Sequence, residues 1–374
     1  MGTPQVSAEA YRDRHAAVLA ALEASDLDGL IVVADWRQKG GLRYFAGRVV
    51  WSRWSYILFQ PGHDPVLFMI APSQRYWAEK EGHIRDVRFS HHLEPALANL
   101  LAERFPGAAT VGIAGLRDTM RVDAYQHLRE ALPAINFIEA TDVTDQIRVR
   151  KTEAEIAALR ETMEIAEAAF ERFDSLLAPG VTHWEIVGEV ERILRGAGSY
   201  DTMILLSAGP YLREPSTESF HEGDFVMFSI ELAGPQGYWV EKGGMFSLGE
   251  PAPTARRLYQ VCIDAVQAAA TLFKPGTQAQ EVAAAVEQVF ERSGFAAGIW
   301  GGHGIGMDVL EPPILLPGVQ DRLEEGMAIG FHPHVVDQTT GLGAYVSDVY
   351  LVTAAGGAPL ARLPHELRVK WGEL

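Results

Sequence analysis

His303 lies in a glycine-rich segment of the chain, GGHGIG at residues 301–306. Glycines on both sides of a histidine let backbone or ligand approach the imidazole closely, and they offer the ring no apolar packing partners. The segment does not have the G-x-G-x-x-G order of a dinucleotide-binding loop, and it lacks the lysine of a phosphate-binding loop. We therefore expect His303 to take part in chemistry rather than to cradle a phosphate.

Two further histidines flank a proline in the segment FHPHVV, residues 331–336. In a continuous strand, alternation would place His332 and His334 on one face together with Gly330. Two imidazoles on one face can bind a metal ion, transfer protons or hold a substrate carboxylate. Packing of both rings as ordinary structural histidines is the alternative.

The segments 223–232 and 237–242 have the pattern of two strands joined by a hairpin turn. Alternation places Ser229 and Glu231 on one face of the first strand, and Glu241 of the second strand is expected across the hairpin from them. A lone strand carboxylate is commonly solvated, so the company of the histidines is what makes Glu241 a candidate. We expect four catalytic residues: His303, His332, Glu241 and Glu231.

The composition of the 374 residues is that of an ordinary globular protein, with 48% hydrophobic and 22% charged residues. The net charge of −17 disfavours nucleic acid and anionic membrane surfaces as partners. The single cysteine, Cys262, permits no intrachain disulfide, and no stretch of 18 apolar residues occurs. The amino-terminal residues lack the basic and apolar regions of a secretion signal. We therefore expect a cytoplasmic protein that acts on a small molecule.

The first part of the chain alternates helical and strand patterns, which predicts a small α/β domain over residues 1–147. A long amphipathic helix is expected from about Lys151, so a second domain is placed at residues 148–374. The first domain is expected to contain helices at 8–25, 73–80 and 94–103 and strands at 29–34, 56–59, 66–70, 111–114 and 135–139.

The second domain contains an internal repeat. Pro179-Gly180, followed by Glu185, is matched 96 residues later by Pro275-Gly276, followed by Glu281. In each copy a long helix precedes the Pro-Gly pair, which ends it, and a second helix and strands follow. This pattern predicts a duplicated helix–helix–sheet unit with a cleft between its halves.

Residues from about 150 to 363 resemble the pita-bread superfamily of creatinase, prolidase, aminopeptidase P and methionine aminopeptidase. The resemblance rests on the repeat, the hairpin GDFVMFSIE…GYWVEKGGMFSLG, and the segments GGHGIGMDVLEPP, EEGMAIGFHPHV and YVSDVYLVTAAGGAPLARLP. The first domain resembles the companion domain of creatinase and prolidase. The implied fold is α+β, with a pita-bread domain after a smaller α/β domain.

In metallopeptidases of this superfamily, two Asp, one His and two Glu hold a pair of metal ions. By resemblance, His303 is retained, Glu241 replaces the second Asp, and Ser229, or Glu231 with a gap, replaces the first. His332 and Ser347 stand at the late Glu positions. Four carboxylates neutralise two divalent ions, and this chain offers fewer. We therefore expect no cofactor, with a single divalent ion on His303, His332 and Glu241 as the alternative.

Creatinase is the metal-free precedent in the superfamily, and its cleft is completed by an arginine and an aromatic residue of the partner subunit. The segment Trp51-Ser52-Arg53-Trp54 resembles that loop. The leading hypothesis is a metal-independent, creatinase-like hydrolase that cleaves a C–N bond of a small nitrogenous acid, acts as a homodimer, and uses His332 or His303 as base. The expected substrate-binding residues are Arg53, Trp51, His334, Ser229 and Ser347.

Three other functions remain open. The first is an Xaa-Pro-type metallopeptidase with a rearranged site for one metal ion. The second is a lyase that acts on a small acid. The third is a catalytically silent pita-bread protein that binds a ligand and releases it unchanged.

Overall fold

The computed structural model of the chain describes residues 6–47, 52–299 and 301–371. The chain forms two compact units, Met1–Arg148 and Val149–Leu374. Each unit has its own sheets and its own apolar core.

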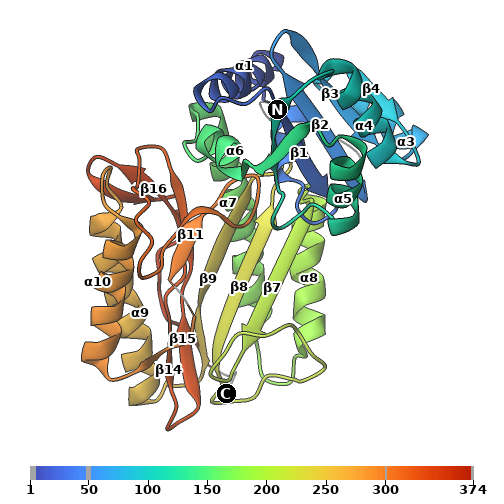
Figure 1. Ribbon diagram of the computed structural model, residues 1–374. Helices are drawn as coiled ribbons and strands as arrows, with labels where there is room; N and C mark the ends of the chain where they lie inside the picture. Colours follow the sequence, from blue (N-terminus) through green and yellow to red (C-terminus); the bar gives the residue numbers. More distant parts are fainter. Residues whose placement is uncertain (1–5, 48–51, 300, 372–374) are drawn as a thin grey trace. The chain divides into compact units, whose positions relative to one another are not determined.

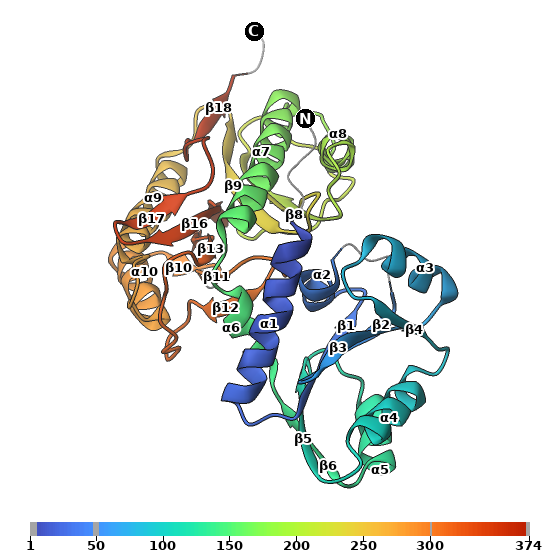
Figure 2. The ribbon, with the colours of Figure 1, turned by 90° about the horizontal axis from the view of Figure 1, so that it is seen from above.

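The first unit contains a six-stranded mixed sheet in the order β4-β3-β2-β1-β5-β6. The central strand β1 is almost entirely buried, so both of its faces must be covered. Ile31 and Val33 pack in one cluster with Leu97 and Leu101 of α4, and Figure 2 shows α1 on the opposite side of the sheet. The elements are α1 Ala8–Ala24, β1 Gly29–Asp35, α2 Gly40–Ala46, β2 Trp54–Gln60, β3 His63–Met69, α3 Pro72–Glu81, β4 Asp86–Phe89, α4 Leu93–Arg104, β5 Ala109–Ala114, α5 Val122–Ala131, β6 Ile135–Glu139 and α6 Thr141–Arg148.

The sequence patterns predict five of these strands and three of these helices, and they miss α2, α5, α6 and β4. Helix α5 shows why. Its buried residues are Ala124 and Leu128 alone, a stripe too thin to give a helical hydrophobic period.

The second unit contains a four-stranded sheet, β18-β9-β8-β7, a five-stranded sheet, β12-β11-β13-β16-β17, and a three-stranded sheet, β10-β14-β15. Figure 1 shows the helix pairs α7–α8 and α9–α10 on the outside of these strands. The elements are α7 Glu153–Leu176, α8 His183–Gly196, β7 Asp201–Ser207, β8 Phe225–Ala233, β9 Trp239–Leu248, α9 Pro253–Leu272, α10 Ala279–Ser293, β10 Ala296–Ala297, β11 Gly302–Gly304, β12 Glu311–Ile314, β13 Ala328–Phe331, β14 His334–Asp337, β15 Leu342–Tyr345, β16 Asp348–Thr353, β17 Gly356–Pro359 and β18 Arg368–Lys370.

The two halves of the second unit have the same local structure where the sequence repeats. Gly180 and Gly276 have φ angles of +88° and +90°, values that favour glycine, and each backbone N–H donates a 2.8 Å hydrogen bond to a carbonyl. Each following helix begins with a carboxylate that accepts a 2.8 Å bond from the cap backbone, Glu185 in one half and Glu281 in the other. The predicted duplication and fold class are therefore confirmed.

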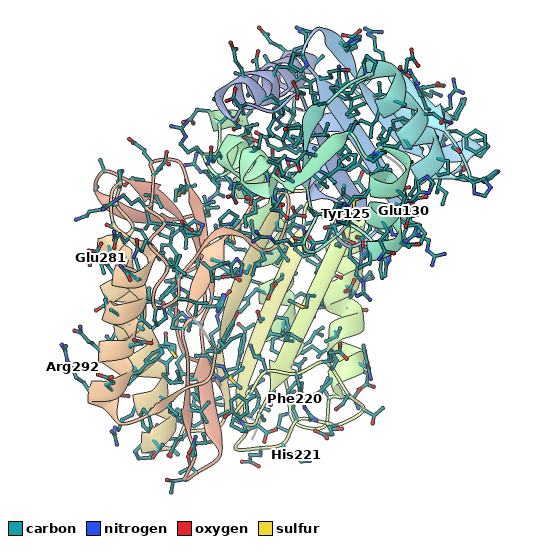
Figure 3. All side chains as sticks on the ribbon, in the orientation of Figure 1. Tyr125, Glu130, Phe220, His221, Glu281 and Arg292 are labelled. Atoms are coloured by element: carbon teal, nitrogen blue, oxygen red, sulfur yellow. The ribbon has the colours of Figure 1, made fainter. Side chains whose placement is uncertain are left out.

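Helix α10 illustrates how these outer helices attach to the sheets. Val282, Val286 and Phe290 recur every four residues and are buried in the core of the second unit. Glu281 and Arg292 are exposed and point away from the strands in Figure 3. In the described ranges, no helix is both long and apolar enough to cross a bilayer.

Candidate functional site

Two carboxyl groups lie side by side on the β8–β9 hairpin. Glu231 of β8 is the direct cross-strand partner of Glu241 of β9, and Ser229 is the partner of Gly243 in the same register. Directly opposed residues of antiparallel strands have side chains on the same face. Ser229, Glu231 and Glu241 therefore share one face of this sheet, and the Glu241 side chain is completely buried.

The short strand β11 positions His303 over the same region. His303 pairs with Gly330 of β13, and a Cβ at Gly330 would lie 2.9 Å from the Oε1 of Glu241, so glycine leaves room for the carboxyl group. The Nδ1 of His303 lies 2.8 Å from the carbonyl oxygen of Gly304. A neutral imidazole that donates from Nδ1 has its lone pair on Nε2, the form that ligates metals.

Glu241, His303 and His332 come together as a buried triad. One ligand atom from each residue lies within 4.8 Å of the other two, and the two imidazole centroids are 5.3 Å apart. Among the described residues, this is the one group of three such side chains close enough to hold a metal ion. The triad lies entirely within the second unit.

The electrostatics of the triad favour a cation. Both carboxyl oxygens of Glu241 are buried and have no hydrogen-bond partner among the described residues. Burial, then Glu231 and then Asp348 raise the pKa of Glu241 well above its usual value. Burial and then His303 lower the pKa of His332 to about 3, which keeps this imidazole neutral. Neutral imidazoles and a carboxyl group that needs a positive partner are the ligands that a divalent ion requires.

Tyr345 is a member of the site that the sequence patterns do not predict. Its hydroxyl lies 3.2 Å from the Oγ of Ser229, and its ring lies nearly parallel to that of His332, at 18° and 6.4 Å. A Cβ at Gly243 would clash with the Tyr345 ring, so this glycine makes room for it. That glycine lies directly opposite Ser229 in the hairpin, and a glycine in a strand is the kind of local signal that indicates a close neighbour.

The surroundings of the Tyr345 hydroxyl connect it to both glutamates. Burial, then Glu241 and then Glu231 raise the pKa of Tyr345 well above its usual value, while the hydroxyls of Ser229 and Ser347 act in the opposite direction. The phenol therefore stays protonated. Burial raises the pKa of Glu231 to about 7.

His334 does not join the triad. The predicted continuous strand is wrong at this point, because β13 ends at Phe331 and β14 begins at His334 in a different sheet. Pro333 between them has no N–H for a ladder hydrogen bond. The Nε2 of His334 lies 2.8 Å from the carbonyl oxygen of Pro210, and His334 pairs with Tyr345 across β14 and β15.

Pro210 also lines a cavity of about 540 Å³ in the second unit. This volume is in the range of small-ligand sites, about 300–1,000 Å³. Its lining residues are His183, Ser207, Ala208, Gly209, Pro210, Tyr211, Leu212, Arg213, Glu218, Ser219, His221 and Asp224.

Two buried ion pairs support the strands that contain the site. Lys151 Nζ lies 2.8 Å from an oxygen of Glu311, with side-chain exposures of 2% and 1%, and Glu311 pairs with Gly304 next to His303. Lys242, adjacent to Glu241, lies 3.3 Å from Asp348, adjacent to Ser347. Neither pair is indicated by a local pattern in the sequence, because each joins residues more than 100 positions apart.

The structure says little about the two candidate residues of the first unit, Trp51 and Arg53. Trp51 lies outside the described residues. Arg53 is exposed, and its guanidinium carbon lies 4.2 Å from the centroid of the Trp54 ring. Their place in the site stays a prediction.

Comparisons with known proteins identify relatives over the whole chain. Residues 157–354, just over half of the chain, match the model of metallopeptidase family M24, and residues 14–150 match the creatinase/prolidase N-terminal domain. The chain is 27% identical to the probable dipeptidase PepE of Mycobacterium tuberculosis over 99% of both chains. It is 29% identical to the Xaa-Pro dipeptidase of Lactobacillus delbrueckii subsp. lactis, over 68% of this chain and 71% of the relative.

A solved structure shows the same relationship. The dipeptidase PepE of Mycobacterium ulcerans superimposes with a TM-score of 0.84 at 26% identity, and the alignment covers 98% of this chain and 100% of the relative. The Xaa-Pro dipeptidase of Bacillus anthracis has a TM-score of 0.83 at 23% identity, over 96% and 100% of the two chains, which shows the fold.

These comparisons correct two expectations. The hypothesis of a metal-independent, creatinase-like hydrolase of a small nitrogenous acid is wrong, because the family model is that of metallopeptidases and the relatives are dipeptidases. The expectation of no cofactor is wrong for the same reason, and the buried triad of Glu241, His303 and His332 agrees with the correction. The broader expectations, a hydrolase in the superfamily of creatinase and prolidase, are confirmed.

Proposed function

The chain belongs to metallopeptidase family M24, and from this membership we propose that it hydrolyses small peptides with one divalent metal ion held by Glu241, His303 and His332. The observation that carries the proposal is the triad itself. Its ligand atoms converge within 4.8 Å, and the buried Glu241 oxygens have no hydrogen-bond partner among the described residues.

The donor set fits one ion. Two imidazoles and one carboxylate bind zinc, manganese or iron at metal–ligand distances of about 2.0–2.2 Å, so the ligand atoms lie about 3–4 Å apart. The separations of up to 4.8 Å in the structure need only small side-chain adjustments to reach that range. Ser229 and Ser347 add hydroxyls rather than carboxylates, which supports one ion rather than two.

A divalent ion at this triad would polarise the scissile carbonyl and activate water. The other roles belong to residues of the chain. Glu231 is outside the triad but on the same sheet face as Glu241, and we assign it the proton transfer from the attacking water to the leaving amine. Ser229, Ser347 and His334 are assigned to substrate binding, with the cavity at Pro210 as the place where one end of a peptide fits.

The proposed substrates are dipeptides, including Xaa-Pro dipeptides. The names of the relatives support this class, and the similarity to the Xaa-Pro dipeptidase extends over 68% of the chain. We also propose a homodimer in which Arg53 and Trp51 complete the partner's cleft, a proposal supported by the resemblance to creatinase. The cytoplasm is the proposed compartment, which agrees with the lone, buried thiol of Cys262.

Metal analysis combined with a peptidase assay tests the function. Protein reloaded with Mn²⁺, Zn²⁺, Co²⁺ or Fe²⁺ and then desalted is expected to retain about one ion per chain and to hydrolyse dipeptides, and a chelator is expected to abolish both. His303→Ala is expected to lose the ion. His334→Ala is the matched control and is expected to retain it, because His334 is bonded to the Pro210 carbonyl instead. Chelator-resistant hydrolysis, or no hydrolysis with any of the four metals, would overturn the proposal.

Gel filtration with light scattering tests the assembly. A monomer with full peptidase activity would remove Arg53 and Trp51 from the proposed site.

A further inference from the structure

Three hydroxyl groups gather beside the triad, and we call Ser229, Tyr345 and Ser347 the hydroxyl cluster. Their residues are 2%, 4% and 0% exposed. The phenol oxygen of Tyr345 lies 3.2 Å from the Oγ of Ser229. Ser347 lies between β15 and β16, and its backbone pairs with Gly243, the direct partner of Ser229. Two segments distant in sequence, one with Ser229 and one with Tyr345 and Ser347, thus bring hydroxyls to one place.

The Tyr345 ring is held in a fixed position. The absence of a side chain at Gly243 provides the space for the ring. His332 lies nearly parallel to it, and His334 packs edge-on at 6.0 Å and 83°. The ring is buried between these neighbours, and its hydroxyl contacts Ser229 on the strand face that also contains Glu231 and Glu241. A donor held in this way needs little reorganisation when charge develops nearby.

Hydrolysis of a peptide bond places negative charge on the carbonyl oxygen. One cation stabilises part of that charge, and neutral O–H donors fixed nearby in a water-poor site stabilise more. In the hydroxyl cluster, Tyr345 has the longest side chain; its hydroxyl lies 3.2 Å from the Oγ of Ser229, and its ring lies 6.4 Å from the ring of His332, a member of the triad. Resting on the proposed function, we propose that Tyr345 is a catalytic residue whose hydroxyl donates a hydrogen bond to the oxyanion of the tetrahedral intermediate.

The atoms balance in this step. The water oxygen forms a bond to the carbonyl carbon, and the π electron pair of the carbonyl moves onto its oxygen, next to the Tyr345 hydroxyl. When that pair returns, the C–N bond breaks and the amine receives the proton that Glu231 took from water. Tyr345 keeps its proton throughout, and Ser229 orients the phenol.

Tyr345→Phe tests the role, because it removes the hydroxyl and keeps the ring. In metal-loaded protein, kcat is expected to fall about 10²–10³-fold, with KM and metal content changed less than about twofold. Affinity for a phosphinic dipeptide analogue, which mimics the tetrahedral intermediate, should fall in parallel with kcat/KM, while inhibition by a product amino acid should not change. Tyr350→Phe is the matched control, since its hydroxyl faces His365 at 3.3 Å, and it should keep full activity.

The outcomes separate the two proposals. If wild-type protein shows metal-dependent dipeptide hydrolysis and Tyr345→Phe is equally active, or binds the phosphinic analogue equally well, the role of Tyr345 is overturned and the proposed function stands. If wild-type protein shows no such hydrolysis, the proposed function is overturned and this inference with it. Should Tyr345→Phe not fold, Ser229→Ala removes the partner of the same hydrogen bond, and an unchanged kcat would then overturn the inference.

Discussion

Glu241 illustrates at the residue scale how a functional group can oppose stability. Without a metal ion, its carboxyl group is buried, and both oxygens lack a hydrogen-bond partner among the described residues. Leaving a buried polar group unsatisfied costs about 1–3 kcal/mol. An ion bound at the triad would satisfy the same oxygens, so this free-energy cost applies only to the metal-free protein.

Glu241→Gln is therefore expected to stabilise the metal-free protein while it abolishes metal retention and activity. The amide has nearly the same shape, so it fits the space left by Gly330. Removal of a fully buried ionisable group that also faces Glu231 and Asp348 should raise the free energy of unfolding by about 1–2 kcal/mol. Chemical denaturation of chelator-treated protein measures this change.

Glu311→Gln is the matched control at a second buried glutamate. It should change stability in the opposite direction, because the amide leaves the Lys151 ammonium buried beside an uncharged partner. Loss of one partner of a buried ion pair costs about 3–5 kcal/mol. Equal destabilisation by both substitutions would contradict the account of Glu241.

At the element scale, the duplicated halves of the second unit provide an internal comparison. In the second helix of each half, α8 and α10, a glutamate of the first turn accepts a hydrogen bond from the backbone N–H of the cap residue. Thr182 also accepts a 3.3 Å bond from the backbone N–H of Glu185, whereas Gln278 makes no side-chain cap bond. Helix α8 therefore has both hydrogen bonds of a capping box, and helix α10 has only the one made by its glutamate.

Gln278→Thr is expected to stabilise the protein by about 0.5–1 kcal/mol, because a threonine hydroxyl can cap α10 as Thr182 caps α8. Thr182→Ala should destabilise it by about 1 kcal/mol. Thermal unfolding of the two variants beside wild-type protein checks both signs. A decrease in melting temperature for Gln278→Thr would show that the halves are not equivalent.

The arrangement of the elements also explains which residues of the site could be predicted from the sequence and which could not. His303 and Glu241 stood out because glycine context and strand alternation are local patterns. Tyr345 did not, because its place beside Ser229 depends on how β15 crosses the β8–β9 hairpin, a long-range contact with no local period. His334 was misplaced because one proline divides a strand between two sheets.

At the scale of the whole molecule, a histidine whose side chain is only 13% exposed makes stability depend on pH. His365 lies 3.3 Å from the hydroxyl of Tyr350, and burial followed by Lys242 lowers its pKa to about 3 from 6.5. The unfolded chain therefore binds a proton below pH 6.5 that the folded chain does not. Stability from this group is present above pH 6.5 and is lost as the pH falls towards 3.

We expect the free energy of unfolding to decrease by about 1.4 kcal/mol per pH unit for each such histidine between pH 6 and pH 4. His365→Gln keeps a partner for Tyr350 and should reduce the slope by about that amount. Urea unfolding at several pH values measures the slope. An unchanged slope in the variant would exclude His365 as a source of acid sensitivity.

The reactivity of the Cys262 thiol measures how often the second unit unfolds. Cys262 is part of α9, and its thiol is completely buried in the core. Its Sγ lies 3.2 Å from the carbonyl oxygen of Ala344, and burial raises its pKa. Thiol reagents attack the thiolate, so both access and ionisation protect this residue. Since the cluster around Cys262 combines α9, α10 and strands from several sheets, local fraying of one element does not expose it.

Labelling of Cys262 by a thiol reagent should therefore be very slow in native protein and fast in denaturant. The labelling rate should follow global unfolding, so addition of the metal ion, which stabilises the folded state by mass action, should slow it further. In His303→Ala, which is expected to lose the ion, the same addition should leave the rate unchanged. Rapid labelling of native protein would show that the core around Cys262 opens independently of the rest, and the triad would then lie in a unit less cooperative than its packing indicates.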